Sequence, residues 1–319
     1  MTRPRCAILD DYYDIALSSA DWSKIADRAD VTVFNHPFVS EQAAASALKD
    51  FEIVCAMRER TAFPRTLLAA LPKLKLLITS GMRNAAIDTE AVKDHDVVLC
   101  GTQYGRDPTA PLTIGLMLEL TRKIGQENAR MHAGEPWQAL GGIEIESKTL
   151  GVIGLGKLGS KVANIAQALG MNVVAWSPNL TPERCKEVGV GYASKEELFA
   201  TADIVTIHVV LSPRSRGLVG ADELARMKPT AYLVNTARGP IVDEQALLEA
   251  LRQKKIAGAG LDVFSVEPLP VDHPFRKLDN VVLTPHLGYA TAEGFRDHYS
   301  QMVQCIDAWF KGETPRRIA

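Results

Sequence analysis

The sequence predicts an α/β protein made of two doubly wound parallel-sheet domains. Short runs rich in Val and Ile alternate with longer amphipathic segments, a pattern typical of parallel sheets whose crossovers are helices. The alternation runs once to about residue 100 and then restarts near residue 149. The length of 319 residues also exceeds what one ordinary hydrophobic core holds, so we expect two cores.

Each apolar run is expected to form one strand. The first set comprises Cys6–Asp10, Val31–Phe34, Ile53–Ala56, Leu76–Thr79 and Val97–Cys100. The second set comprises Thr149–Ile153, Asn172–Trp176, Ile204–His208, Ala231–Asn235, Gly258–Val263 and Val281–Thr284. Short runs of this kind, separated by helical segments, favour βαβ units in both sets.

Two amphipathic segments are expected to be helices that link the domains. Residues 109–130 carry an apolar face at helical spacing, and residues 292–310 carry a comparable one. A chain that leaves by one helix and returns by another indicates a discontinuous first domain. We expect a flavodoxin-like substrate domain over residues 1–104 and 287–319, and a dinucleotide domain over residues 105–286. The active site is expected in the cleft between them, because parallel sheets bind ligands at the carboxyl ends of their strands.

Composition excludes several classes of partner. The 36 basic and 38 acidic residues are well mixed, so no extended basic surface for nucleic acid is expected. No apolar window approaches the roughly 18 residues that a membrane span requires. The first apolar run ends after four residues at Asp10 and Asp11, too soon for a signal peptide, so we expect a cytoplasmic protein. Five scattered cysteines without CxxC spacing indicate reduced thiols and no metal site.

A glycine-rich segment, LGVIGLGKLGSKVA, follows the first strand of the second set and opens a helix. Gly154 permits a tight turn, Gly156 allows backbone amides to approach a pyrophosphate, and Gly159 allows close packing of helix and strand. Lys157 and Leu158 lie between these glycines at the start of the helix. This context predicts a Rossmann dinucleotide site, because the amino end of a helix favours phosphate.

The next strand ends in Ser177, where NAD-binding domains commonly carry an acidic residue for the ribose hydroxyls. Without that carboxylate, nothing repels a 2′-phosphate, and Ser177, Asn179 and Thr181 can donate hydrogen bonds to one. We therefore favour NADP, with NAD left open. The nearest cation in sequence is Arg184, whose reach cannot be judged from spacing.

Three charged or titratable residues follow separate strands of the second set: Arg238, Glu267 and His286. Strand ends of a parallel sheet meet at one edge, so these side chains are expected to converge. Reduction of a 2-keto acid needs a cation for the carboxylate, a proton donor for the developing alkoxide and a group that tunes that donor. The alternatives are structural: a salt bridge for Arg238, a loop cap for Glu267 and a buried histidine for His286.

The chain closely resembles the D-isomer specific 2-hydroxyacid dehydrogenases, the family of phosphoglycerate dehydrogenase and the glyoxylate and hydroxypyruvate reductases. The matching blocks are the glycine motif, the Gly134 and Trp137 segment, Met227-Lys228-Pro229, NTARG, GLDVF, Glu267-Pro268 and TPHLGYAT. The resemblance implies hydride transfer between NAD(P)H and a small 2-keto or D-2-hydroxy acid such as glyoxylate or hydroxypyruvate.

The resemblance also implies residue roles. His286 would be the acid/base, Glu267 would stabilise its protonated form, and Arg238 would bind the substrate carboxylate and carbonyl. Further cofactor contacts would come from His208, Thr236, Ala237 and Asp262. The substrate carboxylate would be received by Ser80, Gly81 and Met82 together with Arg60, although Arg58 and Arg60 can equally be surface residues.

Two departures from the family pattern are Val210, where a proline is usual, and Pro111, where an acidic residue is common. Neither touches the three catalytic positions. The family also implies a homodimer formed through the cofactor domain, with the segment near Trp137 as an arm. The competing interpretations are a dinucleotide-sensing scaffold of the corepressor type with little turnover, and a related enzyme acting on formate or phosphite.

Overall fold

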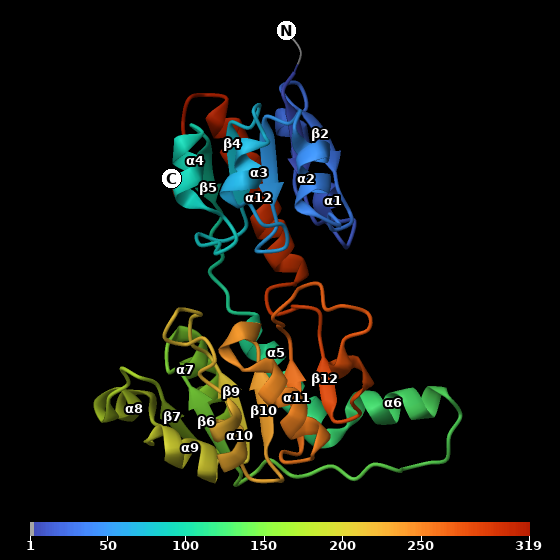
Figure 1. Ribbon diagram of the computed structural model, residues 1–319, viewed down its shortest axis with the longest axis vertical. Coiled ribbons are helices and arrows are strands. Elements are labelled where there is room, and N and C mark those ends of the chain that lie inside the picture. Colours follow the sequence, from blue (N-terminus) through green and yellow to red (C-terminus); the bar gives the residue numbers. More distant parts are fainter. Residues whose placement is uncertain (1–2) are drawn as a thin grey trace. The chain divides into compact units, whose positions relative to one another are not determined.

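The computed structural model describes residues 3–319 and divides them into two compact units (Figure 1). Unit 1 comprises the chain up to Arg106 together with Ala290–Ala319, and unit 2 comprises Asp107–Tyr289. The boundaries expected from the sequence, 104/105 and 286/287, differ from these by two residues at the first junction and three at the second.

Unit 1 is built on a five-stranded parallel sheet with the order β2-β1-β3-β4-β5, the flavodoxin-like order. Its strands are β1 (Arg5–Ile8), β2 (Asp30–Val33), β3 (Ile53–Ala56), β4 (Leu76–Thr79) and β5 (Val98–Gly101). Its helices are α1 (Ala16–Ser19), η1 (Trp22–Ile25), α2 (Glu41–Leu48), α3 (Arg65–Ala69), α4 (Thr89–Asp94) and α12 (Ala292–Trp309). Helices α2, α3 and α4 pack in a row, while α12 packs against α1 and η1.

Unit 2 is built on a seven-stranded parallel sheet with the order β12-β11-β10-β9-β6-β7-β8. Its strands are β6 (Thr149–Ile153), β7 (Asn172–Trp176), β8 (Gly191–Tyr192), β9 (Ile204–Ile207), β10 (Tyr232–Asn235), β11 (Gly258–Leu261) and β12 (Val281–Leu283). The strand order reverses beside β6, which lies between β7 and β9. Such a switch point is where doubly wound sheets bind nucleotides, and the predicted fold class is confirmed.

The helices of unit 2 form two apolar clusters with the sheet. They are α5 (Thr109–Arg122), α6 (Ile124–His132), α7 (Lys157–Ala168), α8 (Pro182–Val188), α9 (Lys195–Thr201), α10 (Ala221–Arg226) and α11 (Glu244–Arg252), with short turns η2 (Gly239–Ile241) and η3 (Pro274–Lys277). Helix α5 packs on α7 and on β10 to β12, and α10 packs on α9 and α11.

The prediction of one continuous helix over residues 109–130 is wrong. The helix breaks at Lys123, whose φ of +55° is left-handed, and α6 begins at the next residue. The Glu119 carboxylate accepts a hydrogen bond from the Gly125 amide, and the Lys123 ammonium lies 5.7 Å from the centre of the Tyr232 ring. The Glu119 contact reaches across the break and the Tyr232 ring is distant in sequence, so helical periodicity could reveal neither contact. Helix α6 buries no side chain.

A buried histidine joins α12 to the end of β5 in unit 1. His298 Nδ1 lies 2.6 Å from Thr102 Oγ1, and the same oxygen accepts a hydrogen bond from the Gly81 amide at 3.0 Å. Thr102 Oγ1 thus lies between the Gly81 amide and the His298 ring. Burial, with the positive charge of Arg58 as a smaller cause, lowers the pKa of His298 to about 4.

We expect this histidine to make unit 1 less stable in acid. Because the pKa of His298 is about 4 in the folded state against 6.5 when unshifted, its stabilising effect is complete above pH 6.5 and is lost as the pH falls toward 4. Between pH 7 and pH 5 the loss is about 2 kcal/mol. Urea unfolding at both pH values should show the wild type losing more free energy of unfolding than His298→Gln by that amount. Equal losses would contradict the assignment of a neutral, buried imidazole.

Candidate active site

The glycine loop after β6 forms a cradle at the switch point of unit 2. Gly154 has a φ of +98°, and a Cβ on Gly159 would lie 1.9 Å from the Gly154 carbonyl oxygen, so the protein itself requires glycine at both positions. Gly156 differs, because a Cβ there would meet no atom within 4 Å. It is also the N-cap of the twelve-residue helix α7 and provides no side-chain cap. Space and unsatisfied amides at the start of α7 suit a pyrophosphate.

A cavity of about 520 Å³ opens beside this cradle. Five residues expected to contact a cofactor line it: Gly154, Gly156, Ser177, Asn179 and His208. The segment after β9 supplies a further wall, consisting of Val209, Val210, Ser212, Arg214, Ser215 and Leu218. Val210, which departs from the family pattern, is 78% exposed. The other residues of this segment belong to no motif, so only the folded structure assigns them to the cavity.

His208 presents an unsatisfied ring nitrogen beside the same cavity. Its Nε2 lies 3.0 Å from Thr206 Oγ1, whereas its buried Nδ1 has no hydrogen-bond partner within residues 3–319. Burial lowers the pKa of His208 to about 4, so the ring is neutral at physiological pH. An orphaned buried nitrogen, together with the open space at Gly156, shows that these residues fit a bound dinucleotide.

Other residues expected to contact the cofactor have partners within the protein. The Lys157 ammonium lies 3.2 Å from Asp107 Oδ1, and Thr236 Oγ1 lies 2.9 Å from Thr113 Oγ1. Of the residues expected to contact a cofactor, six do not line the cavity: Lys157, Leu158, Gly159, Thr236, Ala237 and Asp262. Their contacts with a cofactor stay predictions.

Asp262, at the end of β11, organises the loop that follows β12. Its carboxylate is fully buried and accepts hydrogen bonds from Thr284 Oγ1 at 2.6 Å, the Leu287 amide at 2.7 Å and the Gly288 amide at 2.9 Å. Burial raises the pKa of Asp262, and the three hydrogen bonds oppose that rise. Donors on both sides of His286 thus converge on one carboxylate, which fixes the backbone that carries the imidazole.

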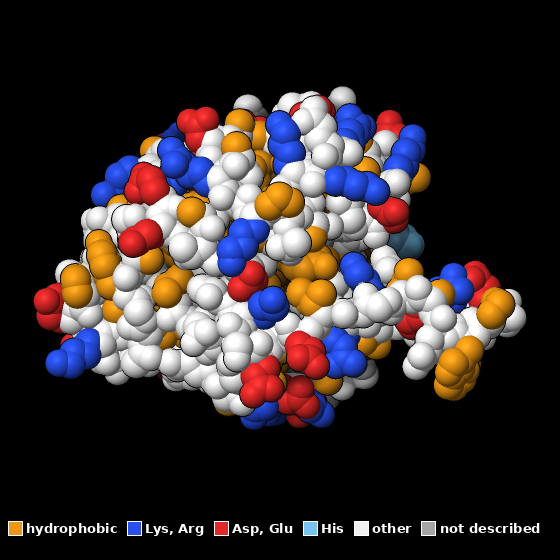
Figure 2. All heavy atoms as spheres, turned by 90° about the horizontal axis from the view of Figure 1, so that it is seen from below, with side chains coloured by type: hydrophobic (Ala, Val, Ile, Leu, Met, Phe, Trp, Pro, Cys, Tyr) orange, Lys and Arg blue, Asp and Glu red, His pale blue; other side chains and the backbone are white. Residues whose placement is uncertain are grey.

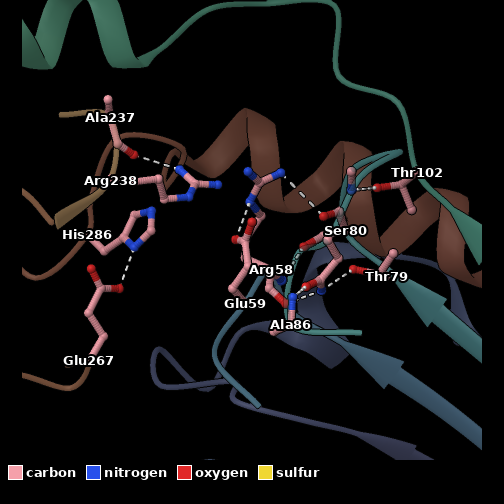
Figure 3. A network of polar contacts seen from close by, with 12 residues as sticks. Arg58, Glu59, Thr79, Ser80, Ala86, Thr102, Ala237, Arg238, Glu267 and His286 are labelled. Atoms are coloured by element: carbon pink, nitrogen blue, oxygen red, sulfur yellow. Dashed lines mark hydrogen bonds and ion pairs between the residues drawn. The ribbon is translucent and has the colours of Figure 1, made fainter. Parts of the chain in front are cut away.

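His286 and Glu267 form a short hydrogen-bonded pair (Figure 3). His286 Nδ1 lies 2.6 Å from Glu267 Oε2, and the other carboxylate oxygen accepts a hydrogen bond from the Phe264 amide at 2.8 Å. The backbone of His286 is left-handed, with a φ of +55°. Its side chain is only 20% exposed, and the Tyr289 ring contacts it edge-on. Since Nδ1 is occupied by the carboxylate, Nε2 is the nitrogen left for a substrate.

Arg238 projects from the turn after β10, and its Nη1 donates to the Ala237 carbonyl at 2.7 Å. The Asn235 side chain closes this turn by donating to the Arg238 carbonyl and accepting from the Ala237 amide, both at 3.0 Å. A Cβ on Gly239 would lie 2.1 Å from the carbonyl carbon of Phe264, so the loops after β10 and β11 are in direct contact. Close packing of these loops brings the segments of Arg238 and Glu267 together at one sheet edge (Figure 3).

Unit 1 gathers polar groups at the carboxyl edge of its own sheet, drawn in part in Figure 3. Ser80 Oγ accepts a hydrogen bond from the Arg58 amide at 2.7 Å, and Gly81 has a φ of +96°. The Gly81 amide is already bonded to Thr102. Arg60 donates to the Asp10 carbonyl at 2.7 Å, and its guanidinium stacks on the Tyr12 ring at 4.4 Å. Ser80, Gly81 and Arg60 thus lie on strand-end loops of one unit, with Met82 next to them in the chain.

Two features are absent from residues 3–319. No group of three or more His, Cys, Asp and Glu side chains is arranged to hold a metal ion there. Within the same residues, no helix combines the length and apolar character needed to cross a bilayer.

Comparison with known proteins identifies relatives of this chain. Residues 114–288 match the profile of the D-isomer specific 2-hydroxyacid dehydrogenase, NAD binding domain. The D-3-phosphoglycerate dehydrogenase of Methanocaldococcus jannaschii is 36% identical over 284 residues, which cover 88% of this chain. The match covers 54% of that protein, so the chain spans about half the length of this relative.

Two solved structures are similar to this chain over nearly its whole length. Phosphoglycerate oxidoreductase from Vibrio cholerae superimposes with a TM-score of 0.92 at 31% identity, covering 97% of this chain and 99% of the other. An acyclic imino acid reductase in complex with NADPH and D-Arg superimposes with a TM-score of 0.75 at 27% identity, covering 99% of this chain and 100% of that one. The family profile spans more than half of the sequence and includes both the glycine cradle and His286. The chain therefore belongs to the D-isomer specific 2-hydroxyacid dehydrogenase family.

Proposed function

We propose that this oxidoreductase transfers a hydride between NAD(P)H and the α-carbon of a small 2-keto or D-2-hydroxy acid, such as glyoxylate or hydroxypyruvate. The observation that carries the proposal is the 2.6 Å pair of His286 and Glu267 in the same unit as the glycine cradle. The resemblance to the family implies that this pair is the acid/base of the reaction.

When bound, the nicotinamide supplies or accepts the hydride. During reduction, His286 donates the proton on Nε2 to the carbonyl oxygen as that oxygen becomes an alkoxide. Glu267 holds Nδ1–H and stabilises the positive charge of the imidazolium that precedes the transfer. In the direction of oxidation, the neutral ring removes the hydroxyl proton through the same nitrogen.

Arg238 serves as the cation for the substrate carboxylate and carbonyl. Its guanidinium has five donors in a planar fork that matches a carboxylate, and the Ala237 carbonyl uses one of them to orient the group. In unit 1, Arg60 and the segment of Ser80, Gly81 and Met82 are proposed to bind the anionic end of the substrate, because a guanidinium suits a carboxylate.

We propose NADP(H) as the preferred cofactor, with NAD(H) as the second candidate. Ser177 directly follows β7 and lacks the carboxylate that would hold the ribose hydroxyls of NAD, and Asn179 on the same loop adds an amide donor. The NADPH bound to the imino acid reductase supports this choice.

A homodimer is proposed through α6 and the segment that follows it. Figure 2 shows this part of unit 2 projecting with hydrophobic side chains at its end. The exposed apolar residues are Ile124, Met131, Trp137 and Leu140, of which Trp137 is 73% exposed. A helix that buries nothing in its own chain gains stability by packing against a second copy.

Substitution at this arm should weaken the dimer. Sedimentation equilibrium is expected to give twice the chain mass for the wild type and a lower mass for Met131→Glu/Trp137→Ala, because both changes remove apolar area from the interface. The exposed Val39→Ala substitution in unit 1 serves as the control and should leave the mass unchanged. A wild type with the mass of one chain at micromolar concentration would refute the dimer.

Loss of absorbance at 340 nm tests the activity directly. With NADPH or NADH and a panel of glyoxylate, hydroxypyruvate, pyruvate and phenylpyruvate, the wild type should turn over at least one acid. His286→Ala should lower kcat by about 10² to 10⁴, the contribution of general acid catalysis, while cofactor affinity measured by fluorescence titration stays within a few fold.

The matched control is His36→Ala, since His36 is exposed in unit 1 and should leave kcat unchanged. Unchanged turnover in His286→Ala would remove this residue from the mechanism. Dinucleotide binding by a wild type that reduces none of the acids would instead favour a sensing scaffold.

A further inference from the structure

One arginine, Arg214, lines the cavity beside the glycine cradle. Arg214 lies in the loop between β9 and α10 and lines the cavity together with Ser177 and Asn179. Its side chain is exposed, and it forms no ion pair or side-chain hydrogen bond with any residue from 3 to 319. A guanidinium in this position is available to an anion that enters the cavity.

The backbone that carries Arg214 is held in place by the buried neighbour Ser215. Ser215 Oγ donates to the Val210 carbonyl at 2.7 Å and accepts from the Ser212 amide at 2.8 Å, and the Ser215 amide donates to the Ser212 carbonyl at 3.1 Å. This turn fixes where the side chain of Arg214 begins, so less ordering is needed when it meets a ligand.

The second cation of the cavity is already engaged. Arg184 Nη1 lies 2.9 Å from Glu187 Oε2, and its Nη2 lies 3.4 Å from Ser160 Oγ. The lining of the cavity contains no aspartate or glutamate. Arg214 is therefore an uncompensated positive charge beside hydroxyl and amide donors, in surroundings that do not repel an anion.

We propose that Arg214, together with Ser177 and Asn179, binds the 2′-phosphate of NADP(H). Arg214 is then a residue that determines the choice between NADP(H) and NAD(H). The inference rests on the proposed function, because it requires that the cavity receives the adenosine half of a dinucleotide. A phosphomonoester is close to a dianion at pH 7, and its oxygens match the fork of a guanidinium, whereas the ribose hydroxyl of NAD(H) offers no charge for it. Arg214 acts on cofactor choice and has no part in the proton transfer.

The test measures binding without turnover. Isothermal titration with adenosine 2′,5′-bisphosphate and with 5′-AMP separates recognition of the 2′-phosphate from recognition of adenosine. The wild type should bind the bisphosphate more tightly. Arg214→Ala should weaken the bisphosphate by about tenfold to a hundredfold, the loss expected for a hydrogen bond to a charged group, and leave 5′-AMP unchanged. Arg216→Ala is the matched control, because Arg216 is exposed two residues away and does not line the cavity.

Kinetics gives a second reading of the same variants. Arg214→Ala should raise the KM for NADPH by a similar factor while kcat and the KM for NADH stay unchanged. Ser177→Asp should act in the same direction by repulsion. Equal weakening of both nucleotides in Arg214→Ala, or a wild type that binds them equally, would overturn the 2′-phosphate assignment and leave the proposed function intact. A wild type that binds neither nucleotide nor NAD(P)H would overturn the proposed function and this inference with it.

Discussion

The buried carboxylate of Asp262 is the interaction on which the catalytic part of unit 2 depends. It binds donors on both sides of His286, so the loop after β12 has one conformation, including a left-handed residue that by itself costs roughly 1 to 2 kcal/mol. An unpaired carboxylate in this position would be strongly disfavoured, and loops without it would leave the imidazole free to turn. Asp262 thus connects a fully buried strand end to the orientation of the proposed acid/base, and this role requires no contact with the substrate.

Parallel topology places the remaining groups. The carboxyl ends of neighbouring strands meet at one edge, where the loops after β10 and β11 touch at Gly239 and bring Arg238 and Glu267 together. The glycine cradle follows β6, at the point where the strand order reverses. Unit 2 therefore carries an imidazole, a guanidinium and a glycine cradle at one edge of a single sheet. The proposed hydride transfer to a 2-keto acid needs a proton donor, a cation and a dinucleotide site, which are the roles proposed for these three groups.

Most of the fold could be predicted from the sequence, because buried parallel strands are continuous Val- and Ile-rich runs and the glycine motif has a strict local context. The two-residue strand β8 has exposed residues and no apolar run, so no pattern marked it. The break at Lys123 depends on Glu119 and on a contact with the Tyr232 ring, which periodicity does not contain. Arg214 was missed for a similar reason. Its loop has no motif, and its place in the cavity follows only from how β7 and β9 are arranged around β6.

The pH dependence of reduction tests most directly whether the pair of His286 and Glu267 is the acid/base. The measurement compares kcat/KM for the keto acid across pH in the wild type and in Glu267→Gln, at saturating cofactor. A carboxylate bonded to Nδ1 favours the protonated form of an imidazole, so its replacement by an amide should move the alkaline limb of the profile to lower pH. A profile with the same alkaline limb in both proteins would contradict the account and assign the proton transfer to another group.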